Sequence, residues 1–342
     1  MRWSIELPGP DSPAALTTPD AFVSAAQAIE HAGFNAAWVT DHPFPALRPG
    51  GPGHHAYDPF TALAFAAAAT CRLRMHINLA VLPYRNPFIT ASAVATLDHL
   101  SGGRVIVGAG AGYLREEFDA LGSDFDARAK LTRESIAAMK AAWSGGEVTL
   151  QGLSWSAAGN SQRPVPLQRP HPPLWRGGNS AAAMAHAIAA CDGWSPYEVQ
   201  PEHSRGHSVA LATIDEVSRR VDGFRRLAAD LGRGDDLDVC LVRRRTAARW
   251  LDQSDQQITE EAAALEKAGV TWVATSLLGA CDPTDFADRA TRLAGVLNLA
   301  GLVDAEESDG PAPGDAQRPA DAEHSTHQST FDTCGSRQST RP

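Results

Sequence analysis

Lysine is scarce and cysteine is scattered in this sequence of 342 residues. The only lysines are Lys130, Lys140 and Lys267, and the formal net charge is −10. This balance argues against a general nucleic-acid binder and against docking on anionic membranes. The five cysteines form no C-x-x-C pair. Neither a disulfide framework nor a zinc ribbon is therefore expected, and a reducing cytoplasm is the simplest location.

Long apolar stretches are also missing. No apolar run approaches the roughly 20 residues that a membrane-spanning helix needs, so no membrane association is expected. The chain opens with the strand-like run WSIEL (3–7) and lacks the basic start and apolar core of a signal peptide. Apolar residues make up 43% of the sequence, which is ordinary for a globular protein with a sizeable core.

The sequence does contain short apolar runs that alternate with helical stretches. The runs are apolar on consecutive positions, which is typical of strands covered on both faces. Eight strands are predicted, at 3–7, 36–40, 75–82, 104–110, 172–176, 192–195, 238–243 and 271–277.

The helices between these strands have clear start signals. Four helices are predicted to start where a capping side chain precedes a proline, at Thr18-Pro19, Asp58-Pro59, Asn86-Pro87 and Asp282-Pro283. The first of them ends at Gly33. Further helices are predicted over 128–143, 180–190, 215–231 and 256–268.

Eight strand–helix units predict an α/β fold, a (β/α)8 TIM barrel. The segment between the fourth and fifth strands contains the proline-rich stretch RPVPLQRPHPP (163–173) and is interpreted as an insertion in the barrel. A doubly wound sheet is the alternative, because strand count alone does not prove closure. From residue 303 the sequence is polar and rich in Pro, Gly and Ser. We therefore expect one barrel domain over 1–302 and a disordered tail over 303–342.

Asp41 and His42 stand in the run VTDHPF (39–44), where the second predicted strand ends. In a (β/α)8 barrel the chemistry belongs at the C-terminal ends of the strands. Imidazole is the usual group for moving a proton near neutral pH, and an adjacent acid can orient a ring or accept a hydrogen bond from a ligand. The structural alternative is that Asp41 caps a turn and His42 packs against the loop before Pro43.

Two glycine-rich turns follow predicted strands. The run GAGAGY (108–113) lets the backbone approach a ligand, although it lacks the spacing of the dinucleotide fingerprint, and a tight turn without a ligand explains it equally well. In the second turn, two glycines and Asn179-Ser180 open an alanine-rich helix, and such a helix start favours an anion. A helix capped by Asn179 or Ser180, with no ligand, is the alternative.

Other polar residues are candidates for ligand or metal binding. Asn78 could face a ligand from within the third strand, and Arg85 could meet an acidic ligand. His54, His55 and Asp58 resemble metal-ligand spacing, but they lie in a glycine-rich loop that is more simply solvated. No metal site is therefore predicted.

Three segments together resemble the luciferase-like monooxygenase superfamily, over about residues 1–300. They are AQAIEHAGFNAAWVTDH (26–42), VLPYRNPFITASAVATLDHLSGGRVIVGAGAGYLREEFDALG (81–122) and GGNSAAAMAHAIAACDGW (177–194). The version with PYRNP followed by LDHLSGGR is similar to the branch that uses the deazaflavin coenzyme F420 in place of FMN. The resemblance implies a (β/α)8 barrel and a homodimer.

The resemblance also implies roles for single residues. His42 would donate or take the proton in catalysis, and Asp41 would fix geometry and contact the ring region of the cofactor. Asn78 falls near the cofactor contact of the third strand. Backbone contacts to the cofactor and to its phosphate or side chain would come from Ala111, Gly112, Gly177, Gly178, Ser180 and Ala181.

The expected function is that of an oxidoreductase that transfers a hydride between coenzyme F420 and a small organic substrate. Sugar-phosphate dehydrogenase relatives carry a glutamate where this chain has Tyr113, which puts that substrate class in doubt. Glu116 and Glu117 are near, but a surface helix face explains them as well. The alternatives are an FMN-dependent monooxygenase that uses oxygen, a non-catalytic binder of a flavin-like ligand, and a metal-dependent barrel hydrolase that uses His42, His54, His55 and Asp58.

Overall fold

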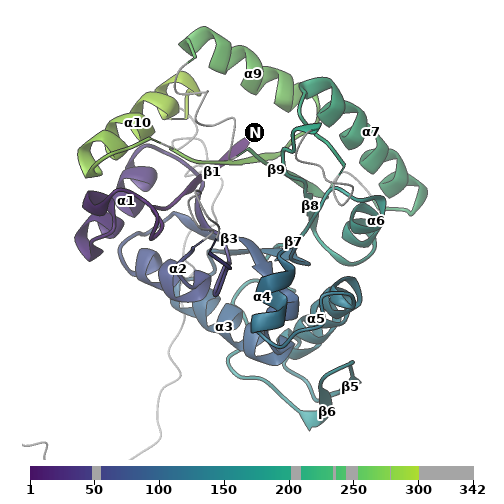
Figure 1. Cartoon of the computed structure of the whole chain (residues 1–342). Helices are drawn as coiled ribbons and strands as arrows, with labels where there is room; N and C mark the ends of the chain where they lie inside the picture. Colours follow the sequence, from purple (N-terminus) through teal and green to yellow (C-terminus); the bar gives the residue numbers. More distant parts are fainter. Residues whose placement is uncertain (48–54, 202–208, 234–235, 244–252, 278, 300–342) are drawn as a thin grey trace, which may run out of the picture.

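The computed structural model describes residues 1–47, 55–201, 209–233, 236–243, 253–277 and 279–299. Its parallel strands form a closed barrel in the order β1-β10-β9-β8-β7-β4-β3-β2 (Figure 1). Because β1 pairs with both β2 and β10, the sheet has no open edge, and the TIM barrel is confirmed over the doubly wound sheet. The barrel strands are β1 (Arg2–Glu6), β2 (Ala36–Val39), β3 (Arg74–Val81), β4 (Val105–Gly110), β7 (Leu174–Gly177), β8 (Gly193–Ser195), β9 (Asp238–Val242) and β10 (Trp272–Thr275).

Helices surround the barrel and connect its strands. They are α1 (Pro19–His31), α2 (Pro59–Ala68), α3 (Pro87–Leu100), α4 (Arg115–Ala120), α5 (Arg128–Trp143), α6 (Ala181–Ala190), α7 (Ile214–Asp230), α9 (Asp255–Lys267) and α10 (Pro283–Val296), with single 3-10 turns at Ala14–Leu16 and Leu82–Tyr84. The four predicted caps are confirmed, since Thr18, Asp58, Asn86 and Asp282 each accept a backbone N–H of the first helical turn.

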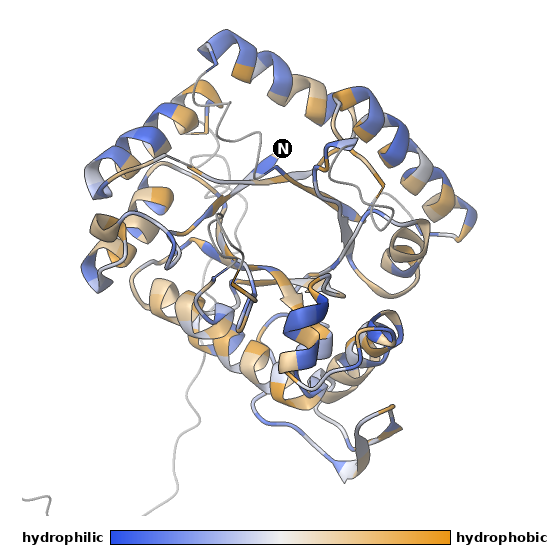
Figure 2. Cartoon of the chain, viewed as in Figure 1, coloured by the Kyte–Doolittle hydropathy of each residue, from blue (hydrophilic) through white to orange (hydrophobic). Residues whose placement is uncertain are grey.

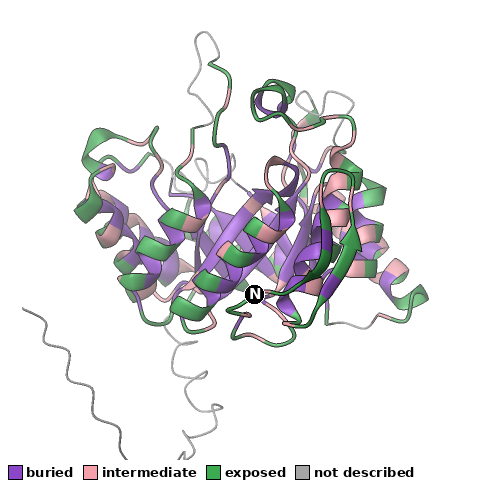
Figure 3. Cartoon of the chain, turned by 90° about the horizontal axis from the view of Figure 1, so that it is seen from below, coloured by how far each residue is buried: buried purple, intermediate pink, exposed green. Residues whose placement is uncertain are grey.

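Two separate apolar clusters stabilise this arrangement. The inner cluster fills the barrel with alternate strand residues, among them Trp38, Trp175 and Trp272. The outer cluster packs the helices against the outward faces of the strands. In Figure 2 the solvent-facing sides of α7, α9 and α10 are blue, that is, hydrophilic. Figure 3 shows the buried strands inside the layer of helices.

The long connection between β4 and β7 confirms the predicted insertion. It contains α4, α5 and an antiparallel hairpin of β5 (Val148–Gln151) and β6 (Ser156–Asn160), which projects away from the barrel in Figure 1. The buried Asp98 carboxylate on α3 accepts hydrogen bonds from the backbone N–H of Gln168, at 3.0 Å, and from its Nε2, at 2.7 Å. The proline-rich end of the insertion is therefore fixed to the barrel.

Residues 303–342, the predicted disordered tail, lie outside the described residues, so this division of the chain stays a prediction. Among the described residues, no helix combines the length and the apolar character needed to cross a membrane.

Candidate active site

The predicted site residues lie at the end of the barrel where the parallel strands finish. Asp41 and His42 follow β2, Asn78 lies near the end of β3, Ala111 and Gly112 follow β4, and Gly177 ends β7. Parallel strands bring their carboxyl ends to one face, so the fold gathers these residues at one mouth.

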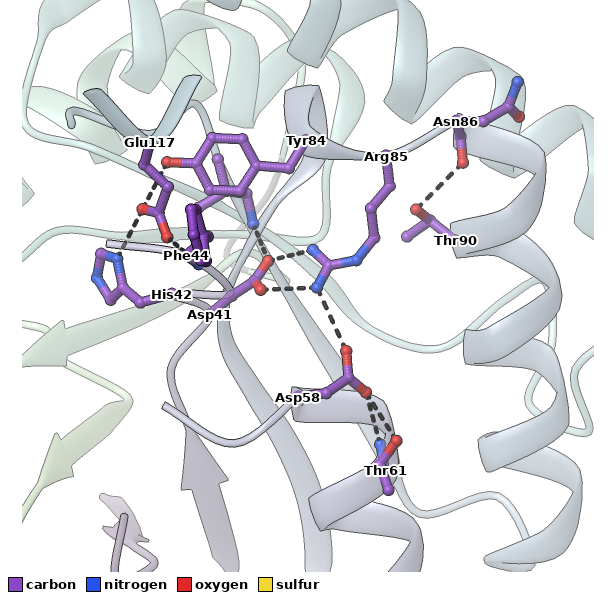
Figure 4. A network of polar contacts seen from close by, with 11 residues as sticks. Asp41, His42, Phe44, Asp58, Thr61, Tyr84, Arg85, Asn86, Thr90 and Glu117 are labelled. Atoms are coloured by element: carbon purple, nitrogen blue, oxygen red, sulfur yellow. Dashed lines mark hydrogen bonds and ion pairs between the residues drawn. The ribbon is translucent and has the colours of Figure 1, made fainter. Parts of the chain in front are cut away.

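Asp41 is 1% exposed and both of its carboxylate oxygens have partners (Figure 4). Oδ2 accepts the backbone N–H of Val81 at 2.8 Å and Nη1 of Arg85 at 2.6 Å, while Oδ1 accepts Nη2 of Arg85 at 2.8 Å. Nη2 of Arg85 also contacts the exposed Asp58 at 3.3 Å. Arg85, a candidate for meeting an acidic ligand, thus joins the segment after β3 to Asp41 in the segment after β2.

His42 is buried beside Glu117 of α4. Its Nδ1 lies 3.1 Å from Oε2 of Glu117. The same carboxylate accepts the hydroxyl of Tyr84 at 2.9 Å and, through Oε1, the backbone N–H of Phe44 at 3.0 Å. Figure 4 shows these contacts converging on Glu117. His42 is thus held on one side by a carboxylate with three donors.

The surroundings of Glu117 favour its ionised form. Burial alone would raise the pKa of this carboxyl group, but the hydrogen bonds from His42, Phe44 and Tyr84 outweigh burial and hold the pKa below its ordinary value. Burial and the adjacent Glu117 raise the pKa of the Tyr84 hydroxyl above its ordinary range. Tyr84 therefore remains a proton donor to Glu117 at neutral pH.

The other ring nitrogen of His42 faces Tyr113. The Tyr113 hydroxyl lies 3.4 Å from Nε2, and the two rings meet edge to face with their centroids 5.8 Å apart. Tyr113 is 60% exposed, so its ring lies on the solvent side of His42.

Glu117 is the important site residue that sequence reasoning missed. Glu116 is exposed, as a surface helix face requires, but Glu117 is completely buried. The sequence spacing does indicate that Glu117 faces inward, because Glu117 shares one face of a helix with the apolar Leu114 and Phe118. Its partner His42 is 75 residues away in the sequence and could not be read from that spacing.

Asn78 has a side chain with unmet hydrogen-bonding capacity. It is 5% exposed, and among the described residues neither its buried Oδ1 nor its buried Nδ2 has a hydrogen-bond partner. Ser276, just after β10, is 4% exposed and its Oγ is likewise unpartnered. Buried polar atoms of this kind are costly unless a water or ligand bonds to them. Both side chains therefore fit a polar ligand at the barrel mouth.

Glycines let the chain pack closely beside Asn78. A Cβ atom at Gly108 or Gly177 would overlap side-chain atoms of Leu79, and one at Gly110 would lie 3.2 Å from Leu79 Cβ. The Leu79 side chain thus crosses β4 and β7 at the mouth, where larger residues would leave it no room.

The turn from β7 into α6, where an anion site was predicted, contains a glycine with a positive φ and the start of a helix. Gly178 has a φ of 113°, which favours glycine. Ser180, one of the two expected caps, accepts the backbone N–H of Ala183 at 3.1 Å. The backbone N–H groups of Ala181 and Ala182, in the first turn of α6, have no carbonyl partner within the helix.

Asn179 has a structural role in this turn. Its Nδ2 donates to the carbonyl oxygens of Tyr197 and Val209, at 2.8 and 2.9 Å, and its Oδ1 accepts the backbone N–H of Tyr197 at 3.0 Å. The side chain therefore joins the turn to both sides of the loop after β8. The buried Arg176 donates to the carbonyl oxygens of Ala109 and Gly177, and burial lowers its pKa to about 10.

Gly112 is explained by packing. Its φ is 76°, and a Cβ atom there would lie 2.6 Å from Phe118 and 2.7 Å from Val81. The glycine is required whether or not the backbone of Ala111 and Gly112 contacts a cofactor, so that contact stays a prediction.

Of the residues with metal-ligand spacing, His55 and Asp58 have partners in the protein. Nδ1 of His55 lies 3.2 Å from Asp11, Asp58 caps α2, and His54 lies outside the described residues. Within the described ranges, no group of three or more His, Cys, Asp or Glu side chains is placed to hold a metal ion.

The sequence and the fold were compared with known proteins. Residues 5–335 match the family described as luciferase-like monooxygenase. An FMNH(2)-dependent dimethylsulfone monooxygenase of Pseudomonas putida is 30% identical over 168 residues, which are 48% of this chain and 42% of that enzyme. The chain spans between 35% and 51% of the length of the curated relatives compared.

Two solved structures share the fold. The monooxygenase RslO1 from Streptomyces bottropensis has a TM-score of 0.70 at 19% identity, covering 90% of this chain and 100% of that one. The coenzyme F420 dependent tetrahydromethanopterin reductase from Methanopyrus kandleri has a TM-score of 0.66 at 19% identity, covering 87% and 99%. The match of residues 5–335 establishes that the chain belongs to the luciferase-like monooxygenase family.

Proposed function

We propose that this protein is an oxidoreductase that binds coenzyme F420 at the barrel mouth and exchanges a hydride with a small organic substrate. The observation that carries the proposal is Asn78 of β3, whose buried amide has no hydrogen-bond partner in the part of the chain that the structure describes. An amide can both donate and accept, which suits the polar edge of a flavin-type ring. The family match supports a redox function.

The remaining mouth residues fit the other parts of such a cofactor. The N–H groups at the start of α6, with Gly177, Gly178, Ser180 and Ala181, would hold an anionic group. Leu79 offers an apolar surface beside Asn78. Bound there, a deazaflavin would supply or accept the hydride.

His42 would exchange the proton that accompanies the hydride, because it is the imidazole at this mouth with a buried carboxylate behind it. Asp41 would act mainly by fixing geometry, since Arg85 and Val81 already bond to both of its oxygens. A direct contact between Asp41 and the cofactor ring stays a prediction.

FMN, with oxygen as co-substrate, is the second candidate. It is supported by the relative whose name states FMNH(2) dependence. The segment PYRNP followed by LDHLSGGR favours F420, by the resemblance described above. Both cofactors carry a phosphate and a tricyclic ring, so the anion turn and Asn78 suit either.

A parallel fluorescence titration with F420 and with FMN tests the proposal. We expect F420 to bind more tightly than FMN. Asn78→Ala should weaken F420 binding about tenfold, because a lost ligand hydrogen bond costs about 1–2 kcal/mol. Asn160→Ala, on the exposed hairpin, is the matched control and should leave binding unchanged. Binding of FMN alone would move the protein to the oxygen-using class, and binding of neither would refute a flavin-type cofactor.

We further propose a homodimer in the cytoplasm. Phe65 on α2 and Ile89 on α3 are 48% and 67% exposed, and such apolar side chains on neighbouring helices suit a subunit contact. Light scattering should give twice the mass of one chain, and Phe65→Glu with Ile89→Glu should shift it toward the monomer. Cell fractionation tests the location.

A further inference from the structure

The contacts on both sides of the His42 ring define which nitrogen carries its proton. We propose that Glu117 is a positioning residue that keeps neutral His42 protonated on Nδ1, so that Nε2, beside the Tyr113 hydroxyl, is the atom that exchanges protons. The proposal deepens the proposed function, because it identifies the reactive atom of the proposed proton carrier.

Glu117 can only accept at this position. Its pKa is held below the ordinary value by hydrogen bonds that outweigh the effect of burial, so the carboxylate is ionised at neutral pH. An ionised carboxylate has no proton to donate. The 3.1 Å contact between Oε2 and Nδ1 of His42 is therefore a hydrogen bond only if Nδ1 carries the hydrogen.

Two further donors hold the carboxylate in this orientation. The backbone N–H of Phe44 binds Oε1 at 3.0 Å, and the Tyr84 hydroxyl binds Oε2 at 2.9 Å. The Tyr84 hydroxyl keeps its proton because its pKa is raised by burial and by Glu117. Neither donor can reverse the direction of the hydrogen bond between Glu117 and His42.

With its hydrogen on Nδ1, neutral imidazole has a lone pair on Nε2. The Tyr113 hydroxyl lies 3.4 Å from this atom, a long contact for a hydrogen bond. Because Tyr113 is 60% exposed, a ligand oxygen can replace its hydroxyl without disturbing buried packing. The geometry thus gives His42 one fixed nitrogen and one exchangeable nitrogen.

This assignment gives the proton of a reacting substrate a defined acceptor, Nε2 of His42. An alcohol substrate would be oxidised by giving the hydride on its carbon to the bound cofactor, while its O–H bond breaks and the proton forms an N–H bond at Nε2 of His42. In the reverse direction Nε2–H returns the proton to the oxygen. The buried negative charge of Glu117 would stabilise the imidazolium, which forms in the first direction and is consumed in the reverse one.

The experiment records long-range ¹H–¹⁵N correlation spectra of the full chain labelled with ¹⁵N-histidine, without cofactor or substrate. A spectrum of His42→Gln assigns the signal. We expect neutral His42 to show the Nδ1–H tautomer in the wild type. Glu117→Gln, whose amide can donate to Nδ1, should abolish this preference, while Glu116→Gln, an exposed neighbour on α4, should keep it. Tyr113→Phe should shift the Nε2 resonance and retain the tautomer.

An Nε2–H tautomer in the wild type would overturn the proposal, even if the Glu117 variant failed to fold. An unchanged tautomer in folded Glu117→Gln would equally overturn it. Since the spectra require no cofactor, this result is independent of the cofactor titration, and either proposal can fail while the other stands.

Discussion

Arg85 contacts two acidic side chains in very different surroundings, and this difference predicts two different coupling energies. Asp41 is 1% exposed at its side chain and binds both Nη atoms, whereas the side chain of Asp58 is 46% exposed and makes one contact at 3.3 Å. Hydrogen bonds to charged groups contribute about 1.5–3 kcal/mol each, and breaking a buried ion pair costs about 3–5 kcal/mol. Exposed pairs contribute at most about 1 kcal/mol. We therefore expect a coupling of about 2–4 kcal/mol between Asp41 and Arg85, and below about 1 kcal/mol between Asp58 and Arg85.

Two double-mutant cycles in urea measure these couplings, with Asp41→Asn, Asp58→Asn and Arg85→Gln as the single variants. The Asp58→Asn variant should still cap α2, because asparagine caps as well as aspartate. The stacking of Arg85 on Phe60, 5.5 Å from the ring centroid, is lost in every Arg85 variant and cancels in the cycle. Equal couplings in the two cycles would refute this reasoning about burial. Asp41→Asn with unchanged stability but lost cofactor binding would make Asp41 a ligand contact.

Two further predictions concern the barrel interior and its mouth. Burial, helped by the charge of Arg74, lowers the pKa of His76 from 6.5 to about 3. Below pH 6.5 His76 therefore binds a proton in the unfolded chain but stays neutral in the folded barrel. The free energy of unfolding thus falls as the pH drops below 6.5. Between pH 7 and pH 5 the wild type should therefore lose about 2 kcal/mol of unfolding free energy that His76→Gln does not lose, as measured by urea denaturation. The same pH dependence in both proteins would contradict this. Gly177→Ala should displace the Leu79 side chain and weaken cofactor binding at least tenfold. Gly9→Ala is the control, because a Cβ atom at Gly9 has open space around it. An unchanged dissociation constant for Gly177→Ala would show that Leu79 does not border the cofactor.

The local elements could be predicted because their signals are local. Apolar runs marked the barrel strands, and the proline pairs at Thr18 and Asp282 marked helix starts within one turn of the chain. Closure of the barrel depends on pairing between Arg2 and Trp272, which no local signal reports. The same limit applies to the site. Asp41 and His42 could be found from their place after a strand, but the partners Arg85 and Glu117 become apparent only when distant segments are brought together.

The Asn179 side chain makes the turn from β7 into α6 and the loop after β8 thermodynamically dependent on each other. Its three hydrogen bonds reach both Tyr197 and Val209, while its own backbone belongs to the proposed anion site. A ligand that moves either end of that loop must alter these bonds, and so changes the free energy of the turn. By reciprocity, occupancy of the turn changes the affinity of the loop for that ligand by the same factor. Cooperative binding of two ligands, one at the turn and one at the loop, would thus arise from one amide, without any movement of the barrel strands.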